Sequence, residues 1–228
     1  MRVVRVRRYP VKSCAGESLD EVAVEARGLA GDRGWAVGDE DGKLASGKDT
    51  RRFRRLDPVF ELAARLGDRP VPQVRFPDSA AWLPVDGPDA DARLRAHFAR
   101  PVRFRPEGPV DHMDSGRVSL VGTASLAALG ALLGTEVDPR RFRVNLVIET
   151  EVPWEEEGWL GHEVRIGSVV LRPVAVIPRC RMVDIAQDGV AREPGLLKAI
   201  GGHRDLRFAV YADVAVTGSI AVDDAVLV

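Results

Sequence analysis

The sequence predicts a mainly β fold with a few helices in a chain of 228 residues. Many segments alternate apolar and polar residues and are rich in β-branched side chains, the two-residue period of a strand with one buried face. The expected strands are residues 2–11, 19–26, 102–106, 141–149, 162–177, 207–216 and 218–228. Asp41-Gly42 and Asp188-Gly189 each predict a hairpin, because Asp-Gly accepts the positive φ angles of a tight turn. The second hairpin is expected to hold Cys180 near the start of its first strand.

Helix signals are fewer. Residues 122–134 predict the longest helix, with leucines on one face, Thr123 or Ser125 as the N-cap, and Gly134 as the stop. Shorter helices are predicted over residues 89–98 and 192–200. Residues 56–66 are ambiguous, because their Asp-Pro start is typical of a helix while the residues that follow fit a strand equally well.

Composition narrows the classes of function. Lys and Arg total 33 against 34 Asp and Glu, so no overall field attracts the protein to nucleic acid or to an anionic membrane. No stretch approaches the roughly 20 apolar residues that a membrane span needs, and the N-terminus alternates like a strand rather than a signal peptide. The cysteines, Cys14 and Cys180, form no CxxC pair and no metal cage. We therefore expect free thiols and a cytoplasmic protein.

Cys180 is the first candidate for chemistry. It lies between Arg179 and Arg181, and positive neighbours favour the thiolate, which acts as nucleophile or metal ligand. A buried, inert cysteine is the alternative, and this segment taken alone favours it.

Other polar residues stand in short strand or turn segments elsewhere in the chain. They are Lys12, Ser13, Arg33, Arg143 and Asn145. If the fold gathers them around Cys180, they form an oxyanion pocket beside a soft ligand, which suits a phosphate-bearing organic cofactor and a thiophilic metal. Taken singly, each is more readily explained as a solvated surface residue.

Several of these segments, taken in order along the chain, resemble a known family. The segment "YPVKSCAGESLDEVAVEARGLAGDRGWAV" is similar to the opening of the MOSC N-terminal domain, and "RFRVNLVIE", "IGSVVLRPV" and "RCRMVDIAQDGVAREPGLL" follow in the order of the MOSC domain proper. The resemblance is strongest to mitochondrial amidoxime-reducing components and their bacterial relatives, which reduce N-hydroxylated compounds. It implies a MOSC-type β-barrel, residues 107–228, with an N-terminal β-rich domain, residues 1–106. The Pro- and Gly-bearing segment 105–116 supports that boundary.

The resemblance also implies roles for single residues. Cys180 would be the single protein ligand to molybdenum, beside the two dithiolene sulfurs of molybdopterin. The residues that would hold this molybdenum cofactor are Lys12, Ser13, Arg33, Thr123, Ser125, Arg143, Asn145 and Arg179. A helix N-terminus is in any case a ready anion site, which is a separate physical reason to include Thr123 and Ser125. Asp184 is the nearest candidate proton donor, with His112 and His162 more remote, although His112 is more readily explained as a surface residue.

One stretch departs from the family. Where relatives carry a Thr-Gln-Arg-like run, this chain has "ASGKDTRRF", so that Ser46 and Lys48 stand in for two members and the glutamine is missing. This difference affects the expected contacts on the substrate side.

The resemblance implies a molybdenum-cofactor-dependent oxidoreductase that reduces N-hydroxylated or N-oxygenated small molecules. Because the chain has no cysteine cluster for an iron-sulfur centre, electrons are expected from a separate protein of iron-sulfur, flavin or haem type. One alternative is a sulfur carrier or cofactor-handling protein with a persulfide on Cys180. Another is a hydrolase that pairs Cys180 with His112 or His162. The last is a β-barrel binding module that has lost its metal.

Overall fold

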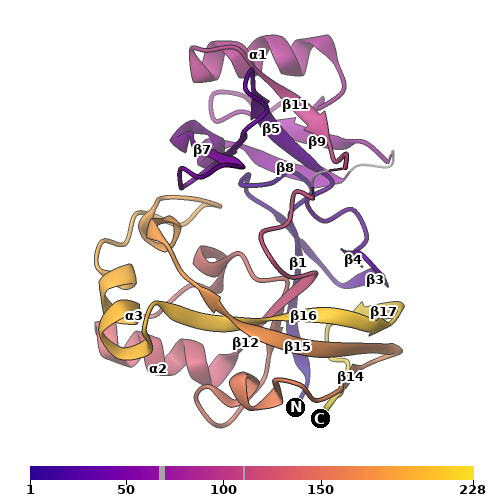
Figure 1. Ribbon diagram of the computed structural model, residues 1–228, viewed down its shortest axis with the longest axis vertical. Helices are drawn as coiled ribbons and strands as arrows, with labels where there is room; N and C mark the ends of the chain where they lie inside the picture. The colour runs from indigo at the N-terminus through magenta and orange to yellow at the C-terminus, as the bar shows by residue number, and fades with distance from the viewer. Residues whose placement is uncertain (67–69, 110) are drawn as a thin grey trace.

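The computed structural model describes residues 1–66, 70–109 and 111–228, and its elements form two bodies (Figure 1). The upper body holds α1 and β5 to β11, and the lower body holds α2, α3, β1 to β4 and β12 to β18. Both chain ends lie together at the bottom of the lower body. Most described elements are strands, accompanied by three α-helices, which confirms the mainly β class. None of the described helices has the length and apolar character needed to cross a membrane.

The largest sheet joins both ends of the sequence. Its strand order is β18-β14-β15-β16-β12-β13-β1-β2. The strands are β1 (Val3–Arg8), β2 (Glu17–Leu19), β12 (Val118–Gly122), β13 (Leu146–Ile148), β14 (Val164–Ile166), β15 (Val169–Pro178), β16 (Arg207–Val216) and β18 (Val226–Leu227). Strands from the first 19 residues therefore complete the sheet of the second half, and the domain boundary expected after residue 106 stays a prediction.

The ladders between the described strands do not close this sheet into the expected β-barrel. The segment before β18, at one end of the sheet, nevertheless meets β1, because Arg2 and Ala225 form an isolated bridge and the Val3 amide donates to the Asp224 carbonyl at 2.9 Å. Further backbone hydrogen bonds flank the bridge, from the Asp223 amide to the Val3 carbonyl at 2.8 Å and from the Val226 amide to the Met1 carbonyl at 2.9 Å. A cluster of buried aliphatic side chains from this sheet and from β3 (Glu21–Glu25) fills the space inside the curve.

Smaller sheets complete both bodies. In the lower body β17 (Gly218–Ala221) pairs with β3, and β3 pairs with β4 (Gly28–Leu29). The upper body has the order β11 (Val102–Pro106), β5 (Trp35–Asp39), β6 (Leu44–Ser46), β7 (Phe53–Arg55) and, separately, β10 (Leu83–Pro84), β9 (Pro72–Arg75), β8 (Ala63–Leu66). The hairpin predicted at Asp41-Gly42 is confirmed by the pairing of β5 with β6. The upper body has its own buried cluster, from Val11 to Phe104.

The helices agree with the sequence in type and differ in their bounds, since the helix predicted over residues 192–200 starts at Leu196 and continues through Gly201-Gly202 to Arg204. They are α1 (Pro88–Phe98), α2 (Thr123–Leu133) and α3 (Leu196–Arg204). Gly134 ends α2 with a φ of 67°, as predicted, but Gly122 is the N-cap instead of Thr123 or Ser125. The ambiguous residues 56–66 contain both alternatives, a 3₁₀ helix η1 (Asp57–Glu61) followed by β8. Helices α2 and α3 pack on one side of the main sheet through a third buried cluster.

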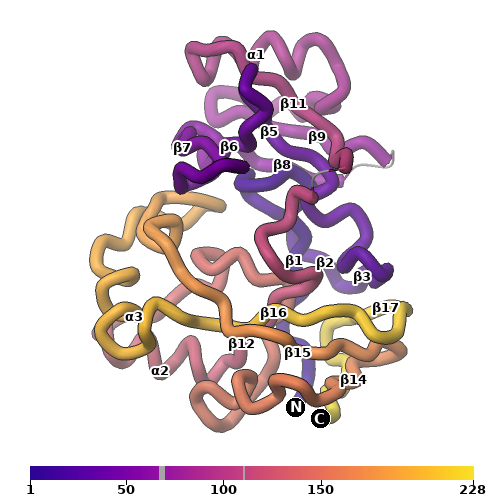
Figure 2. Tube along the Cα trace, viewed as in Figure 1, coloured from indigo at the N-terminus to yellow at the C-terminus, as the bar shows by residue number. Residues whose placement is uncertain are grey.

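Two of the strand predictions are wrong, the one over residues 141–149 and the hairpin at Asp188-Gly189. Residues 139–142 form the 3₁₀ helix η2 (Pro139–Phe142), so the strand expected over residues 141–149 begins only at Leu146. Asp188-Gly189 does form a tight turn, with φ values of 51° and 76°, but a single bridge between Gln187 and Val190 replaces the expected hairpin strands. The chain instead leaves β15 through the 3₁₀ helix η4 (Arg181–Asp184) and runs beside the upper body before it reaches α3 (Figure 2).

Candidate functional site

A cavity of about 220 Å³ lies where the two bodies meet, and the chain segments around it are far apart in sequence. Its lining residues are Lys12, Ser13, Arg33, Ser46, Lys48, Asp114, Ser115, Ser119, Phe142, Arg143, Ile177, Pro178, Arg179, Cys180, Met182, Val183 and Tyr211. Six residues singled out from the sequence therefore converge there: Lys12, Ser13, Arg33, Arg143, Arg179 and Cys180. Their convergence decides against the explanation of each as an isolated surface residue.

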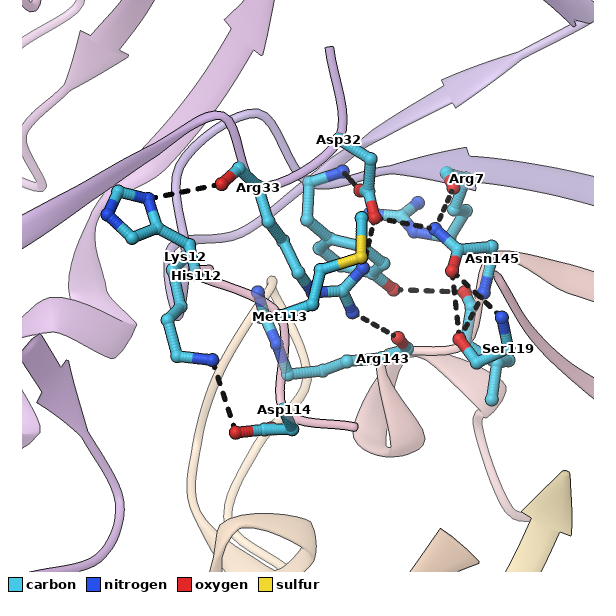
Figure 3. Close-up of polar contacts among 12 residues, drawn as sticks. Arg7, Lys12, Asp32, Arg33, His112, Met113, Asp114, Ser119, Arg143 and Asn145 are labelled. Atoms are coloured by element: carbon cyan, nitrogen blue, oxygen red, sulfur yellow. Dashed lines mark hydrogen bonds and ion pairs between the residues drawn. The ribbon is translucent and has the colours of Figure 1, made fainter. Parts of the chain in front are cut away.

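The cavity is strongly cationic. Five of the side chains that line it are lysines or arginines, and Asp114 is the single carboxylate among the described residues that line it. The Lys12 ammonium lies 3.3 Å from Asp114 Oδ1, as Figure 3 shows, and Lys48 lies 3.5 Å from the same oxygen. Burial acts to raise the pKa of Asp114, but Lys12, Lys48 and Arg33 lower it to about 2. The carboxylate therefore stays ionised at neutral pH and offsets only one of the five positive charges.

We expect anion binding in this cavity to weaken above pH 8. Burial lowers the pKa of Lys12 from 10.5 to about 8, an effect that Asp114 opposes and Arg33 strengthens. Below pH 8 the side chain is charged and attracts an anion; above pH 8 it becomes neutral and the attraction is lost. Calorimetric titration of the metal-free protein with pyrophosphate should show affinity falling about fivefold between pH 7 and 9.5, or ~1 kcal/mol. Lys12→Met should bind more weakly and lack this step, and a flat profile for the wild type would contradict the assignment.

Two of the arginines are held against one buried tyrosine ring. The guanidinium carbons of Arg33 and Arg143 lie 5.1 and 4.3 Å from the centroid of the Tyr9 ring. Arg33 also pairs with Asp32 and donates to the Arg143 carbonyl at 3.1 Å, while Arg143 donates to a backbone carbonyl at 2.7 Å. These contacts fix both planar groups before any ligand arrives, which reduces the ordering cost of binding.

Two buried donors of the cavity have no partner. Ten buried side-chain nitrogen or oxygen atoms of the described residues lack a hydrogen-bond partner, and the two that belong to cavity-lining residues are Arg143 Nη1 and Arg179 Nη2. The other guanidinium nitrogens of Arg179 donate to the Phe208 and Phe142 carbonyls at 2.8 and 3.0 Å, and burial lowers its pKa to about 10. Native proteins rarely leave buried charged donors unpaired, so a bound anion is the simplest way to satisfy them.

The backbone at this cavity carries unusual conformations. Ser13, Arg33 and Arg143 all have positive φ, at 69°, 52° and 54°, although none is a glycine. Left-handed conformations of such residues cost about 1–3 kcal/mol each and cluster at ligand sites, where the surroundings hold them. Three such residues in one cavity indicate that the fold maintains the geometry of the cavity at a cost in local backbone stability.

Cys180 gives the cavity its soft atom. It ends the loop after β15, precedes η4, and is half-buried, with the apolar side chains of Met182 and Val183 beside it in the wall. Cys14 differs, because it is fully buried in the upper core and burial raises the pKa of its thiol to about 12. Cys14 therefore packs within the upper core.

Asn145 lies behind the cavity instead of lining it. Its side-chain oxygen accepts from the amide and hydroxyl of Ser119, at 3.1 and 2.9 Å, and its amide donates to Arg7 O and Asp32 Oδ2 at 3.2 Å (Figure 3). The Asn145 side chain is therefore already engaged within the protein. Because Asp32 pairs with Arg33, Asn145 orients a cavity residue through a neighbour.

The expected roles of Thr123 and Ser125 at the cavity need correction. Neither residue lines the cavity. Thr123 Oγ1 exchanges hydrogen bonds with the backbone of Thr150, and Ser125 Oγ donates to the buried Glu156 carboxylate at 2.7 Å. The protein's own groups thus occupy the start of α2, so the helix is confirmed, whereas the anion site expected at its start lies outside this cavity and stays a prediction.

Asp184 is also displaced from its expected role as proton donor. It does not line the cavity, and its Oδ1 accepts the Leu197 amide at 2.8 Å near the start of α3. We expect Asp184→Ala to lower the free energy of unfolding by ~1 kcal/mol, as the loss of a helix-start contact does, and to leave the cavity's chemistry in place. Denaturant unfolding and cofactor content measure the two effects. A variant that loses catalysis while it keeps its cofactor and stability would restore the original assignment.

The two histidines considered as bases do not lie in the cavity. His112 is buried rather than on the surface, so the preferred surface explanation is wrong, and its Nδ1 lies 3.2 Å from the Arg33 carbonyl (Figure 3). His162 is exposed. Since neither residue lines the cavity of Cys180, the hydrolase hypothesis lacks a base for the thiol.

Several cavity residues gave no usable signal in the sequence. Asp114 and Ser115 stand in a segment that was interpreted only as a domain boundary, and Tyr211 belongs to an ordinary strand pattern. Within the described residues, no group of three or more His, Cys, Asp or Glu side chains is arranged to hold a metal ion.

Two descriptions of known families match the chain. The description "MOSC domain" matches residues 107–227, and "MOSC N-terminal beta barrel domain" matches residues 1–71. The chain is 26% identical to mitochondrial amidoxime reducing component 2 of Bos taurus, over 96% of this chain and 80% of the relative. It is equally identical to mitochondrial amidoxime-reducing component 1 of Homo sapiens, over 86% of this chain and 70% of the relative.

A longer relative and a solved structure complete the comparison. Molybdenum cofactor sulfurase of Danio rerio is 25% identical over 89% of this chain, which spans only 31% of that protein. The crystal structure of the YUAD protein from Bacillus subtilis aligns with 99% of this chain and 93% of its own, with a TM-score of 0.56 and 12% identity. At that identity the two proteins share a fold, and the likeness says nothing about activity.

Proposed function

The chain belongs to the MOSC domain family, and from that premise we propose that it is a molybdenum-cofactor-dependent oxidoreductase that reduces N-hydroxylated or N-oxygenated small molecules. Electrons would come from a separate electron-transfer protein. One observation carries the proposal: Cys180 lines the same cavity as five cationic side chains. Two of those side chains have buried nitrogen donors without hydrogen-bond partners.

The donor set fits the cofactor that the family resemblance implies. Molybdopterin carries a phosphate and two thiolate sulfurs, so it needs cationic donors for the first and leaves room for a protein thiolate at the metal. Arg143 and Arg179 offer the unpartnered nitrogens, with Arg33 and Lys12 beside them, and Ser13 offers a small polar group. Cys180 would be the protein's ligand to molybdenum.

When bound, this group would supply two-electron chemistry at a soft, sulfur-ligated metal that can take up the oxygen of an N–O bond. The reaction balances as R–NHOH plus two electrons and two protons giving R–NH₂ and water. The chain's own part is to hold the cofactor's anionic end with fixed guanidinium groups and to present the thiol beside the apolar wall of Phe142, Ile177 and Met182. That wall limits the water around the reacting atoms.

Two relatives support the reaction class through their names, which describe the reduction of amidoximes. The test is expression in a host that makes the cofactor, followed by an assay of benzamidoxime reduction to benzamidine with a chemical reductant. Turnover that depends on molybdenum is expected. Protein that carries molybdenum and pterin yet reduces neither amidoximes nor other N-hydroxylated compounds would overturn the proposal.

Sulfur transfer is a second candidate. It is favoured by the similarity to molybdenum cofactor sulfurase and by a half-buried thiol that opens into a cavity. Intact-protein mass spectrometry that finds a persulfide on Cys180, in a protein without reductase activity, would select this candidate instead.

A further inference from the structure

We infer that Lys48 makes the mouth of this cavity selective for N-oxygenated substrates that also carry a carboxylate or a similar anionic group. The inference rests on the proposed function and names its substrate class. It depends on contacts of this chain's own residues, in the stretch where the sequence departs from the family pattern.

Lys48 is the solvent-facing member of a pair of lysines. Its side chain is 39% exposed, whereas the side chain of Lys12 is 5% exposed. Both ammonium groups approach the single carboxylate of Asp114, Lys12 more closely at 3.3 Å and Lys48 at 3.5 Å. One carboxylate cannot neutralise two ammonium groups, so a positive charge remains where solvent enters the cavity.

An aromatic ring holds that charge in place. The Lys48 ammonium lies 5.0 Å from the centroid of the buried Phe53 ring, and Lys12 lies 4.7 Å from the same centroid. Arg52, the third cation near this ring, is committed to the backbone carbonyls of Asp111 and Met113. Lys48, which is more exposed than Lys12 and shares the Asp114 carboxylate with it, is therefore the cation of this group best placed to meet an incoming anion.

The loop of Lys48 is fastened beside the reactive sulfur. Arg181, the residue after Cys180, donates to the Gly47 carbonyl at 3.3 Å and forms two 2.8 Å contacts with the Asp57 carboxylate. A Cβ built on Gly47 would lie 3.5 Å from Met182 Cβ, an ordinary van der Waals contact, so the loop lies against η4. Lys48 and Cys180 thus line the same cavity, and a substrate that reaches a metal held by Cys180 would meet the Lys48 ammonium.

The test compares two substrates that differ by one charged group, benzamidoxime and 4-carboxybenzamidoxime. Lys48→Gln removes the charge and keeps a polar side chain of similar length. Lys43→Gln is the matched control, because Lys43 lies in the nearby β5–β6 turn and does not line the cavity. The readouts are kcat/KM for each substrate and, without reductant, the calorimetric affinity of the protein for each compound.

For wild type and Lys43→Gln we expect a preference for the carboxylated substrate that weakens at high salt. In Lys48→Gln this preference should fall about fivefold, mainly through the KM of the carboxylated substrate. Reduction of both substrates with an unchanged preference in Lys48→Gln would overturn the inference and leave the proposed function standing. If neither compound is reduced, the proposed function fails, and equal affinity of wild type and Lys48→Gln for 4-carboxybenzamidoxime overturns the inference separately.

Discussion

Replacing Cys180 by serine is expected to lower reductase activity by more than ~100-fold and to reduce the molybdenum content of the purified protein. A serine hydroxyl is a harder ligand and is not ionised at neutral pH, so it cannot replace a thiolate at a soft metal. Cys180 is the cysteine that lines the cavity, so no second thiol stands in for it among the lining residues. Elemental analysis and the amidoxime assay measure the two losses.

The matched control is Cys14→Ala. Cys14 is buried in the upper core, and the high pKa of its thiol keeps it protonated. The control should lose a little stability and keep its molybdenum. If Cys180→Ser retained full metal and activity, or if Cys14→Ala lost the metal while remaining folded, the assignment of Cys180 as the ligand would be wrong.

Replacing Arg143 by methionine should weaken anion binding by about 10- to 100-fold, the equivalent of ~1.5–3 kcal/mol for a hydrogen bond to a charged group. Arg143 combines an unpartnered buried nitrogen, a stacking contact on Tyr9 and a donor to the Cys14 carbonyl. Methionine keeps much of the apolar contact and removes the charge. Pyrophosphate titration of metal-free protein and the pterin content of loaded protein measure the loss.

Arg165→Met is the control for this change. Arg165 is exposed on β14 and does not line the cavity, so its loss should leave both readouts unchanged. Thermal unfolding of both variants separates weaker binding from misfolding. If Arg143→Met folded normally and bound pyrophosphate as tightly as the wild type, Arg143 would not be the main anion contact of the cavity.

The periodicity of the sequence predicted the helices and strands better than it predicted which residues pack against them. The helix over residues 122–134 was predictable because its leucines and its terminal glycine are local signals. Whether its N-terminus faces a ligand depends on the chain that packs there, and Thr150 and Glu156 arrive from a distant segment. Asp184 illustrates the same limit, because its partner, the Leu197 amide, is 13 residues away.

The cavity itself was predictable only through its charged members. Arginines and lysines beside turns stand out in a sequence, and the resemblance supplied the order in which they occur. Asp114 and Tyr211 do not stand out, because a carboxylate in a loop and a tyrosine in a strand have many ordinary explanations. The strained backbone at Ser13, Arg33 and Arg143 could not be predicted either, since serine and arginine rarely adopt left-handed conformations and do not indicate them in a sequence.

The most direct test of the central claim is metal and pterin analysis of the wild-type chain, purified from a host that makes the molybdenum cofactor. The cavity's charge, its unpartnered donors and the position of Cys180 predict molybdenum and pterin in equal amounts, each approaching the amount of protein. Folded protein from that host with neither molybdenum nor pterin would contradict the account.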